Sequence, residues 1–228
     1  MDGDADIAKV AALIGDPARA AILDALLDGA NHRAGELAER AGIAPSTASA
    51  HLARLLDGGL VECERLGRER RFRLASPAVA AALEALAQLA PPTRVQSLRA
   101  SARGDAIRRA RTCYDHLAGR VGVAVTDALV AGGALVPVDA AFALTTRGER
   151  KLTRLGVDVA EARSRRRAFA LACLDWSERR PHLAGALGAA LADAVIDAGW
   201  LKRRPHDRGL IVTHAGEEAL RRELKVAL

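Results

Sequence analysis

Residues 35–74 read GELAERAGIAPSTASAHLARLLDGGLVECERLGRERRFRL and predict two short helices that are followed by two strands. Apolar residues at helical spacing favour a first helix over Gly35–Ala41, and Gly42 ends it. Pro45 suits the first turn of the next helix, because the N–H group that proline lacks is not needed there. The two helices are therefore expected to meet at a tight turn.

The second predicted helix has one apolar side and one short polar side. The apolar stripe runs from Ala48 to Leu56 and predicts the side that packs into the core. Short side chains near a helix start fit the major groove of DNA, which is about 12 Å wide. The side chains expected to face the groove are Ser46, Thr47, Ser49, Ala50 and Arg54.

A basic hairpin is predicted after the second helix. Leu60–Leu66 and Glu69–Leu74 are strand-like and flank a Gly67-Arg68 turn. The hairpin carries Arg65, Arg68, Arg70, Arg71 and Arg73, which suit phosphates beside the groove. The whole order is typical of a winged helix-turn-helix. The alternatives are an ordinary helical domain with solvated arginines, and a winged helix that serves as a protein–protein interaction module without effector sensing.

From Ile7 to Leu74 the chain resembles the ArsR/SmtB family of dimeric bacterial transcriptional regulators. The segments that carry the resemblance are LIGDPARAAILDALLDG, GELAERAGIAPSTASAHLARLLDGGLV and RLGRERRFRL. The resemblance implies that the helix holding Ser46–Leu56 reads operator DNA and that the hairpin, with Arg68 and Arg70, touches the flanking backbone. His51 borders the apolar stripe, so a packing role is expected for it. Ile7–Ile14 and Ser76–Leu89 are the implied dimerisation helices.

The chain departs from this family where its members usually bind metals. Ala34–Ala41 lacks the Cys-x-Cys pair of the best-known members. The helix expected after the hairpin offers Glu84 but no histidine or cysteine. The resemblance therefore implies no sensor site in the first domain.

The composition fits a globular protein with a polyanionic partner. The chain has 228 residues, a net charge of +6 and a pI near 9.9. Aromatic residues make up only 3%, which argues against binding single strands by base stacking. No apolar run is long enough to span a bilayer, and the acidic start MDGDAD is unlike a signal peptide, so we expect a cytoplasmic protein without membrane contact. Three cysteines are too few for a disulfide scaffold.

The second half of the sequence contains an internal repeat. Pro91-Pro92 predicts a boundary, which gives domains 1–92 and 93–228. HLAGRVGVAVTDALVAGGAL begins at His116, and HLAGALGAALADAVIDAGWL begins at His182. Cys-x-Asp precedes each copy. The two repeats are expected at about 95–157 and 158–228, each folded like a winged helix.

The predicted elements of this half are mainly helices. A long helix is expected over Val95–Tyr114 and a second from HLAG to about Ala131. Ala134–Val138 should pair with Ala141–Leu144, and helices should cover Thr146–Leu155 and Asp158 to about Glu178. The expected fold class is mainly α with short β-hairpins (α+β).

Reactive side chains gather where the predicted long helix meets HLAG. On a helix, Cys113 and His116 would share a face and could chelate a soft metal, with Cys173 or His182 completing the site. The alternatives are a thiol pair that answers oxidants, a small-molecule pocket lined by Trp176 and Tyr114, and a purely structural junction. The candidate effector or metal residues are Cys113, Asp115, His116, Cys173, Asp175, Trp176 and His182. No cofactor is required, and the metal is unknown.

Further arginines lie on the predicted long helices and are read as solvated faces, or else as auxiliary contacts to the DNA backbone. They are Arg108, Arg109, Arg111, Arg163, Arg165, Arg166 and Arg167. Catalysis is not expected, because no glycine turn presents either cysteine and no nucleotide loop follows a strand. The sequence therefore predicts a homodimeric, double-stranded-DNA-binding regulator, a repressor released by an unknown effector.

Overall fold

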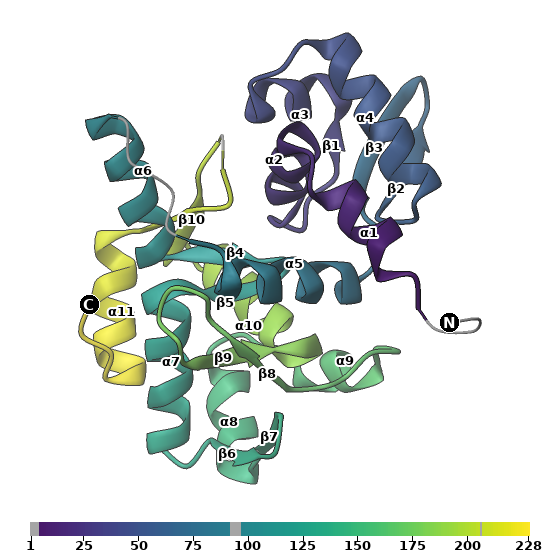
Figure 1. The fold of residues 1–228 in the computed structure, drawn as a ribbon. Helices are drawn as coiled ribbons and strands as arrows, with labels where there is room; N and C mark the ends of the chain where they lie inside the picture. The colour runs from purple at the N-terminus through teal and green to yellow at the C-terminus, as the bar shows by residue number, and fades with distance from the viewer. Residues whose placement is uncertain (1–4, 92–96, 206) are drawn as a thin grey trace. The chain divides into compact units, whose positions relative to one another are not determined.

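A computed structural model describes residues 5–91, 97–205 and 207–228 (Figure 1). The chain forms two compact units, Met1–Leu83 and Glu84–Leu228, which are described separately below. Pro92 and the predicted helix start at Val95 lie outside the described residues. Within the described ranges, none of the helices combines the length and the apolar character needed to cross a bilayer.

The N-terminal unit is a winged helix-turn-helix. Its three-stranded antiparallel sheet has the order β1-β3-β2, with Cys63 opposite Phe72. The elements are α1 (Ile7–Ile14), α2 (Pro17–Leu26), β1 (His32–Arg33), α3 (Ala34–Ala41), α4 (Pro45–Asp57), β2 (Val61–Leu66), β3 (Glu69–Leu74) and the start of α5 (Pro77–Leu89). The predicted helices and the predicted hairpin are confirmed.

The turn between α3 and α4 forms as its residue types require. Gly42 has φ +67°, in the left-handed region that glycine enters without strain, and its N–H bonds to α3 carbonyls. The N–H of Ile43 donates to Ala38 O at 3.0 Å. Pro45 occupies the first turn of α4, and Leu52 and Leu55 of the predicted stripe are buried. The turn therefore fixes how α4 leaves the core.

Helix α1 is held mainly by one side chain of α2. The guanidinium of Arg19 donates to Leu13 O at 2.6 Å and to Ala12 O at 2.8 Å, which are carbonyls at the end of α1. No residue of α1 is buried. This helix is thus attached to the unit while most of its apolar surface stays open.

The C-terminal unit runs twice through the order hairpin, helix, hairpin, helix. The first run is β4 (Arg111–Cys113), β5 (His116–Ala118), α7 (Gly119–Ala131), β6 (Leu135–Val138), β7 (Ala141–Leu144) and α8 (Thr146–Arg154). The second is β8 (Leu171–Leu174), β9 (Pro181–Ala184), α10 (Gly185–Asp197), β10 (Leu201–Arg203), β11 (Leu210–Val212) and α11 (His214–Leu224). Helix α6 (Leu98–Arg109) precedes the first run, and α9 (Val159–Ser164) lies between the two. β6-β7-β8-β9 form one sheet.

Two helix predictions in this unit are wrong, and the helices expected through HLAG start later, because His116–Ala118 and Pro181–Ala184 are strands and α7 and α10 begin at Gly119 and Gly185. The long helix stops at Arg109, since Arg111–Cys113 pairs as a strand with His116–Ala118 through a turn at Tyr114, φ +61°. The helix that Asp158 caps ends at Ser164; an irregular segment follows, and strand β8 begins at Leu171 within the range predicted as helix. In both places strand pairing overrides helical periodicity. The predicted hairpin at 134–144 and the helix after Thr145 are confirmed.

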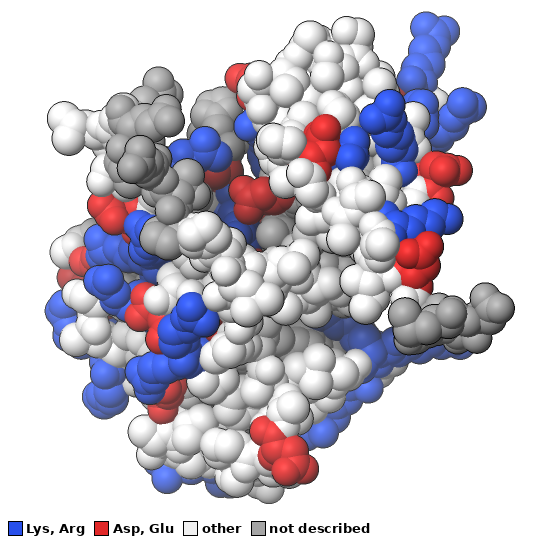
Figure 2. Space-filling view, in the orientation of Figure 1, with Lys and Arg blue, Asp and Glu red and all other residues white. Residues whose placement is uncertain are grey.

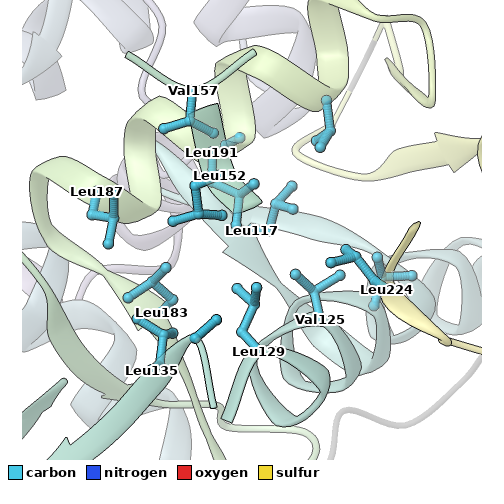
Figure 3. Close-up of a cluster of buried hydrophobic side chains, with 14 of the residues drawn as sticks. Leu117, Val125, Leu129, Leu135, Leu152, Val157, Leu183, Leu187, Leu191 and Leu224 are labelled. Carbon is cyan, nitrogen blue, oxygen red and sulfur yellow. The ribbon is translucent and has the colours of Figure 1, made fainter. Parts of the chain in front are cut away.

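The core of the C-terminal unit is aliphatic and lies between the buried faces of α7 and α10 (Figure 3). Helix α7 packs against strand β9 and helix α10 packs against strand β5, and the apolar side chains of both helices enter this cluster. The labelled side chains in this cluster are Leu117, Val125, Leu129, Leu135, Leu152, Val157, Leu183, Leu187, Leu191 and Leu224. This core supports the strand ends that carry Cys113, His116, Cys173 and His182.

Gly119 and Gly185, the glycines of the two HLAG segments, sit where a strand becomes a helix. Their φ angles are +73° and +79°. A Cβ on Gly119 would lie 2.7 Å from Arg108 O, and one on Gly185 would lie 2.7 Å from Ala168 O. Both positions therefore require glycine for its conformation and for space.

We expect Gly119→Ala to lower the free energy of unfolding by about 2 kcal/mol or more, because left-handed backbone and a backbone clash add together. Gly104→Ala is the matched control: its Cβ would meet only the flexible end of Arg108, inside α6. That variant should be neutral or slightly more stable. Thermal and denaturant unfolding of the full chain measure both, and equal stabilities would contradict the assignment.

Candidate functional site

Helix α4 presents the expected polar side to solvent. Ala48, Leu52 and Leu55 point into the unit and are buried. The Ser49 hydroxyl donates to Pro45 O at 3.0 Å, which leaves the hydroxyl oxygen able to accept. All five predicted groove-facing residues are exposed: Ser46, Thr47, Ser49, Ala50 and Arg54. The structure therefore brings the predicted groove-facing residues onto one open surface.

The wing, strands β2 and β3, adds a basic edge to the N-terminal unit, and Figure 2 shows Lys and Arg side chains gathered there. Arg68 at the tip and Arg65 are exposed, and among the described residues neither has a carboxylate partner. Arg70 is exposed too; it lies over the Phe72 ring at 5.3 Å and donates to Cys63 Sγ at 3.3 Å. These guanidinium groups are open to an external anion.

His51 lies on the packing side of α4. Its Nδ1 is 3.9 Å from Asp16 Oδ1, and only 13% of its side chain is exposed. Asp16 itself caps α2 by accepting from the Ala18 and Arg19 N–H groups. This placement agrees with the packing role expected from the sequence.

A buried carboxylate that the sequence reasoning missed supports the helix-turn-helix. Asp28 accepts from Arg40 of α3 at 2.7 Å, and both its oxygens lie within 2.9 Å of His32 Nε2 in β1. Burial, the largest effect, opposes ionisation of Asp28. The bonds to His32, the Ala30 N–H and Arg40 nevertheless lower the pKa of Asp28. The ionised carboxyl thus joins α2, β1 and α3.

In the C-terminal unit, two hairpins bring Cys113, His116, Cys173 and His182 together. One ligand atom from each lies within 4.8 Å of the others. Cys113 is the cross-strand partner of His116, and Cys173 is the partner of His182. The expectation that Cys113 and His116 share a helix face is wrong, because both lie on strands. The pairing across a hairpin brings them together instead.

The cluster is enclosed and incompletely hydrogen bonded. Cys113 and His116 are buried, His182 is fully buried, and Cys173 is half-buried. The two Sγ atoms are 3.9 Å apart, and the imidazole centroids are 5.1 Å apart at a tilt of 35°. Among the described residues, Nε2 of His116 and both ring nitrogens of His182 have no hydrogen-bond partner. Three of the four donor groups are thus withdrawn from water.

Each histidine of the cluster faces a carboxylate with its other nitrogen. His116 Nδ1 is 3.3 Å from Asp115 Oδ1, and Asp115 is paired with Arg167 at 2.5 Å. His182 Nδ1 is 3.3 Å from Asp175 Oδ2, within ion-pair distance but outside hydrogen-bonding geometry. Asp175 in turn is buried with Arg111 at 2.9 Å. Arginines therefore balance both carboxylates.

The thiols and the nearby acid titrate abnormally. The hydrogen bond with Cys113, aided by both imidazoles, lowers the pKa of Cys173, while that same bond and burial raise the pKa of Cys113. Burial opposes ionisation of Asp175, but His182 and Arg111 hold the pKa of Asp175 well below its usual range. Burial likewise disfavours the imidazolium, yet Asp175 and Cys173 raise the pKa of His182. The pair therefore favours one thiolate, on Cys173.

Trp176 packs against Arg111, which forms the buried ion pair with Asp175. The Arg111 guanidinium lies 4.7 Å from its ring centroid. An open hollow in this unit is lined by α8 residues Arg147, Glu149, Arg150, Thr153 and Arg154 and includes neither Trp176 nor Tyr114. These positions favour a supporting role for the tryptophan.

Most of the arginines predicted on the long helices have partners inside the chain. Arg111 is completely buried with Asp175. The other ion pairs are Arg108–Asp105, Arg109–Glu217, Arg163–Glu149, Arg165–Glu161 and Arg167–Asp115. Glu84, the acid noted on α5, pairs with Arg208. Structural pairing accounts for these charges without a nucleic acid.

Comparisons with known proteins agree with the first unit and extend over the whole chain. Residues 14–64 match the family described as a helix-turn-helix domain. The HTH-type transcriptional regulator YdfF of Bacillus subtilis is 44% identical over 223 residues, which cover 98% of this chain and 99% of that protein. The regulator CmtR of Mycobacterium tuberculosis is 40% identical over 83 residues, 36% of this chain and 70% of that protein.

A solved homodimeric winged helix-turn-helix DNA-binding domain from Mycobacterium bovis is 34% identical. It covers 39% of this chain and 88% of its own, with a TM-score of 0.33. The full-length match to YdfF assigns the class: the chain belongs to the ArsR family of HTH-type transcriptional regulators. It is a DNA-binding regulator and not an enzyme.

We expect Asp28→Asn to lower the free energy of unfolding at pH 7 by about 1–3 kcal/mol, because charge-assisted bonds to His32 and Arg40 are lost. The folded-state pKa of Asp28 is depressed, so its contribution is present above the unfolded value near 3.9 and is lost as the pH falls. Denaturant unfolding at pH 7 and pH 3 measures this. The exposed Asp57→Asn is the control, and an equal deficit at both pH values would contradict the assignment.

Proposed function

We propose that the chain is a homodimeric repressor that binds a double-stranded operator in a sequence-specific way, in the cytoplasm, and that an effector releases it. The exposed polar side of α4 beside unpaired wing arginines is the observation that carries this proposal. Buried apolar residues hold the opposite side of α4, so the helix offers DNA a fixed surface. The buried residues of α4 therefore need not move when the helix enters a groove of DNA.

The side chains of α4 and of the wing suit different contacts with DNA. Ser46, Thr47, Ser49 and Ala50 lie in the first turns of α4, where short side chains let the helix approach base edges. Arg54 is long enough to reach guanine or a phosphate. Arg68 and Arg70 on the wing contact phosphates beside the groove. Specificity thus resides in α4, and the salt-dependent part of the affinity is shared with the wing.

The open apolar surfaces of α1 and α5 support a dimer. Ile7 is 76% exposed and Leu89 is 83% exposed, although both are apolar. Val10 and Leu86 are open on the same helices. A second copy that covers the exposed residues of α1 would place two α4 helices on half-sites of a palindromic operator. The homodimeric domain of the Mycobacterium bovis relative is consistent with this arrangement.

The C-terminal region is proposed to be two copies of one winged-helix-like unit, at about 95–157 and 158–228, joined to a DNA-binding and dimerisation domain at 1–92. The paired HLAG and Cys-x-Asp segments support this division, as does the repeated element order. An effector held by this region releases DNA only if it binds the free and DNA-bound geometries with different affinity. The candidate effector residues remain those of the Cys/His cluster, with Asp115, Asp175 and Trp176.

We expect Arg54→Ala combined with Arg68→Ala to weaken operator binding at least tenfold, because one base or phosphate contact and one wing contact are lost. The operator is first selected by the wild-type protein from random duplexes. Fluorescence anisotropy on that duplex and on a scrambled one, at several salt concentrations, then measures affinity and specificity. Arg221→Ala on the exposed side of α11 is the matched control.

Unchanged specific binding by the double variant would refute the recognition surface. Wild-type binding that selects no sequence, or that barely responds to salt, would instead favour a protein interaction module.

Ile7→Glu is expected to shift the protein from dimer toward monomer, because a charge would replace an apolar side chain at the proposed interface. Sedimentation equilibrium of the full chain measures the dissociation constant. Val138→Glu, at an apolar position that is 50% exposed on the β6–β7 hairpin, controls for added charge. A monomeric wild type, or equal effects of both variants, would contradict this assignment.

A further inference from the structure

We propose that Cys113, His116, Cys173 and His182 form a tetrahedral site for one thiophilic divalent ion of the zinc class. This goes beyond the DNA-binding function, because the site lies within the C-terminal unit and its occupancy can be measured without DNA. Two cysteines and two histidines are a ligand set that zinc takes in closed, four-coordinate sites. Hard cations such as magnesium prefer oxygen ligands, which this cluster does not supply at its centre.

The spacing of the two sulfur atoms fits a shared ion. Two thiolates that each lie about 2.3 Å from a tetrahedral zinc ion are about 3.8 Å apart. Cys113 Sγ and Cys173 Sγ are 3.9 Å apart. A disulfide would require a separation near 2.05 Å, so the sulfurs would have to approach considerably. The sulfur pair is therefore already spaced for metal coordination.

The histidines supply the second, independent observation. Nε2 of His116 and Nε2 of His182 are buried, and among the described residues neither has a hydrogen-bond partner. A buried polar nitrogen without a partner costs about 1–3 kcal/mol. Coordination would satisfy both nitrogens at once. Oxidation of the thiols to a disulfide would leave them unsatisfied, so the imidazoles favour the metal over a redox pair.

The surroundings of the histidines are those of a metal site. A metal-bound histidine usually directs its other nitrogen to a carboxylate or carbonyl, which fixes the ring orientation. Asp115 faces His116 Nδ1 at 3.3 Å, and Asp175 faces His182 Nδ1 at 3.3 Å. Arg167 and Arg111 balance these carboxylates. Two thiolates and a divalent ion would then leave the enclosed centre neutral.

An ion at this position would join the two runs of the C-terminal unit. Cys113 and His116 come from the β4–β5 hairpin, whereas Cys173 and His182 come from the β8–β9 hairpin. Four protein ligands leave no open position for substrate or water, which makes the site structural or regulatory rather than catalytic. Since the unfolded chain holds no preformed site, ion binding would stabilise the folded unit.

The test uses the reduced, chelator-treated full chain and Co²⁺ as the probe, followed by Zn²⁺. We expect one Co²⁺ per chain, with the strong visible absorption of tetrahedral cobalt and a thiolate-to-cobalt charge-transfer band. One equivalent of Zn²⁺ should abolish both signals and raise the melting temperature. Competition with a chromophoric chelator then gives the Zn²⁺ affinity.

Variants with matched controls locate the site. Cys173→Ser and His182→Gln should weaken Zn²⁺ binding more than about 100-fold, because loss of a direct ligand exceeds the effect of its supporting groups. Asp115→Asn should weaken Zn²⁺ binding about 10-fold to 100-fold while the cobalt spectrum keeps its thiolate band. Cys63→Ser and His214→Gln, outside the cluster, should bind like the wild type.

Several outcomes would overturn the site. The first is that the cobalt charge-transfer band is missing although the wild-type thiols are shown to be reduced. The second is that Cys63→Ser weakens Zn²⁺ binding as much as Cys173→Ser does. The third is that a Cys113–Cys173 disulfide forms in air as readily with Zn²⁺ as without it. If His182→Gln fails to fold, judged by circular dichroism, Cys173→Ser and Asp115→Asn still decide. The Arg54→Ala and Arg68→Ala double variant should bind Co²⁺ normally, which separates failure of this site from failure of DNA binding.

Discussion

The buried carboxylate of Asp175 is the constraint on which the C-terminal unit depends. It accepts from Arg111 at 2.9 Å, from the Gly119 N–H at 2.7 Å and from the Ser177 hydroxyl at 2.7 Å. These bonds join the end of β8 to β4 and to the first residue of α7. A buried ion pair is kept only when its remaining lone pairs are satisfied, and here backbone and hydroxyl donors satisfy them. The same carboxylate lies beside His182, so one side chain both links these elements and contacts the Cys/His cluster.

The two units differ in where they keep their polar groups. The N-terminal unit must keep a polar helix face and basic side chains in solvent, and it does so by burying only one stripe of α4. The C-terminal unit encloses nucleophilic and imidazole groups in an aliphatic shell built from α7 and α10. An exposed basic surface suits a large anionic partner, whereas an enclosed sulfur and nitrogen set suits a small ion.

Local sequence was sufficient to predict the structure wherever one residue type decides the backbone conformation. Gly42, Pro45 and the Gly67-Arg68 turn each favour one local geometry, and the helix-turn-helix and wing follow from them. The hairpin at 134–144 was equally readable. Helical periodicity failed at Cys113 and after Ser164, where pairing with strands distant in sequence or across a tight turn decides the conformation. Asp28 was missed because its partners, His32 and Arg40, converge only in the folded unit.

The sequence by itself determined the family, the exposed polar side of α4 and the hypothesis that Cys113, His116, Cys173 and His182 form one site, because these depend on residue type and spacing. Only the tertiary structure decided how the four meet. It put each Cys opposite a His across a hairpin, brought one ligand atom of each residue within 4.8 Å of the others, and left three imidazole nitrogens buried without hydrogen-bond partners among the described residues. Distances between separate strands depend on the packing of α7 and α10 and on Asp175, which no local pattern encodes.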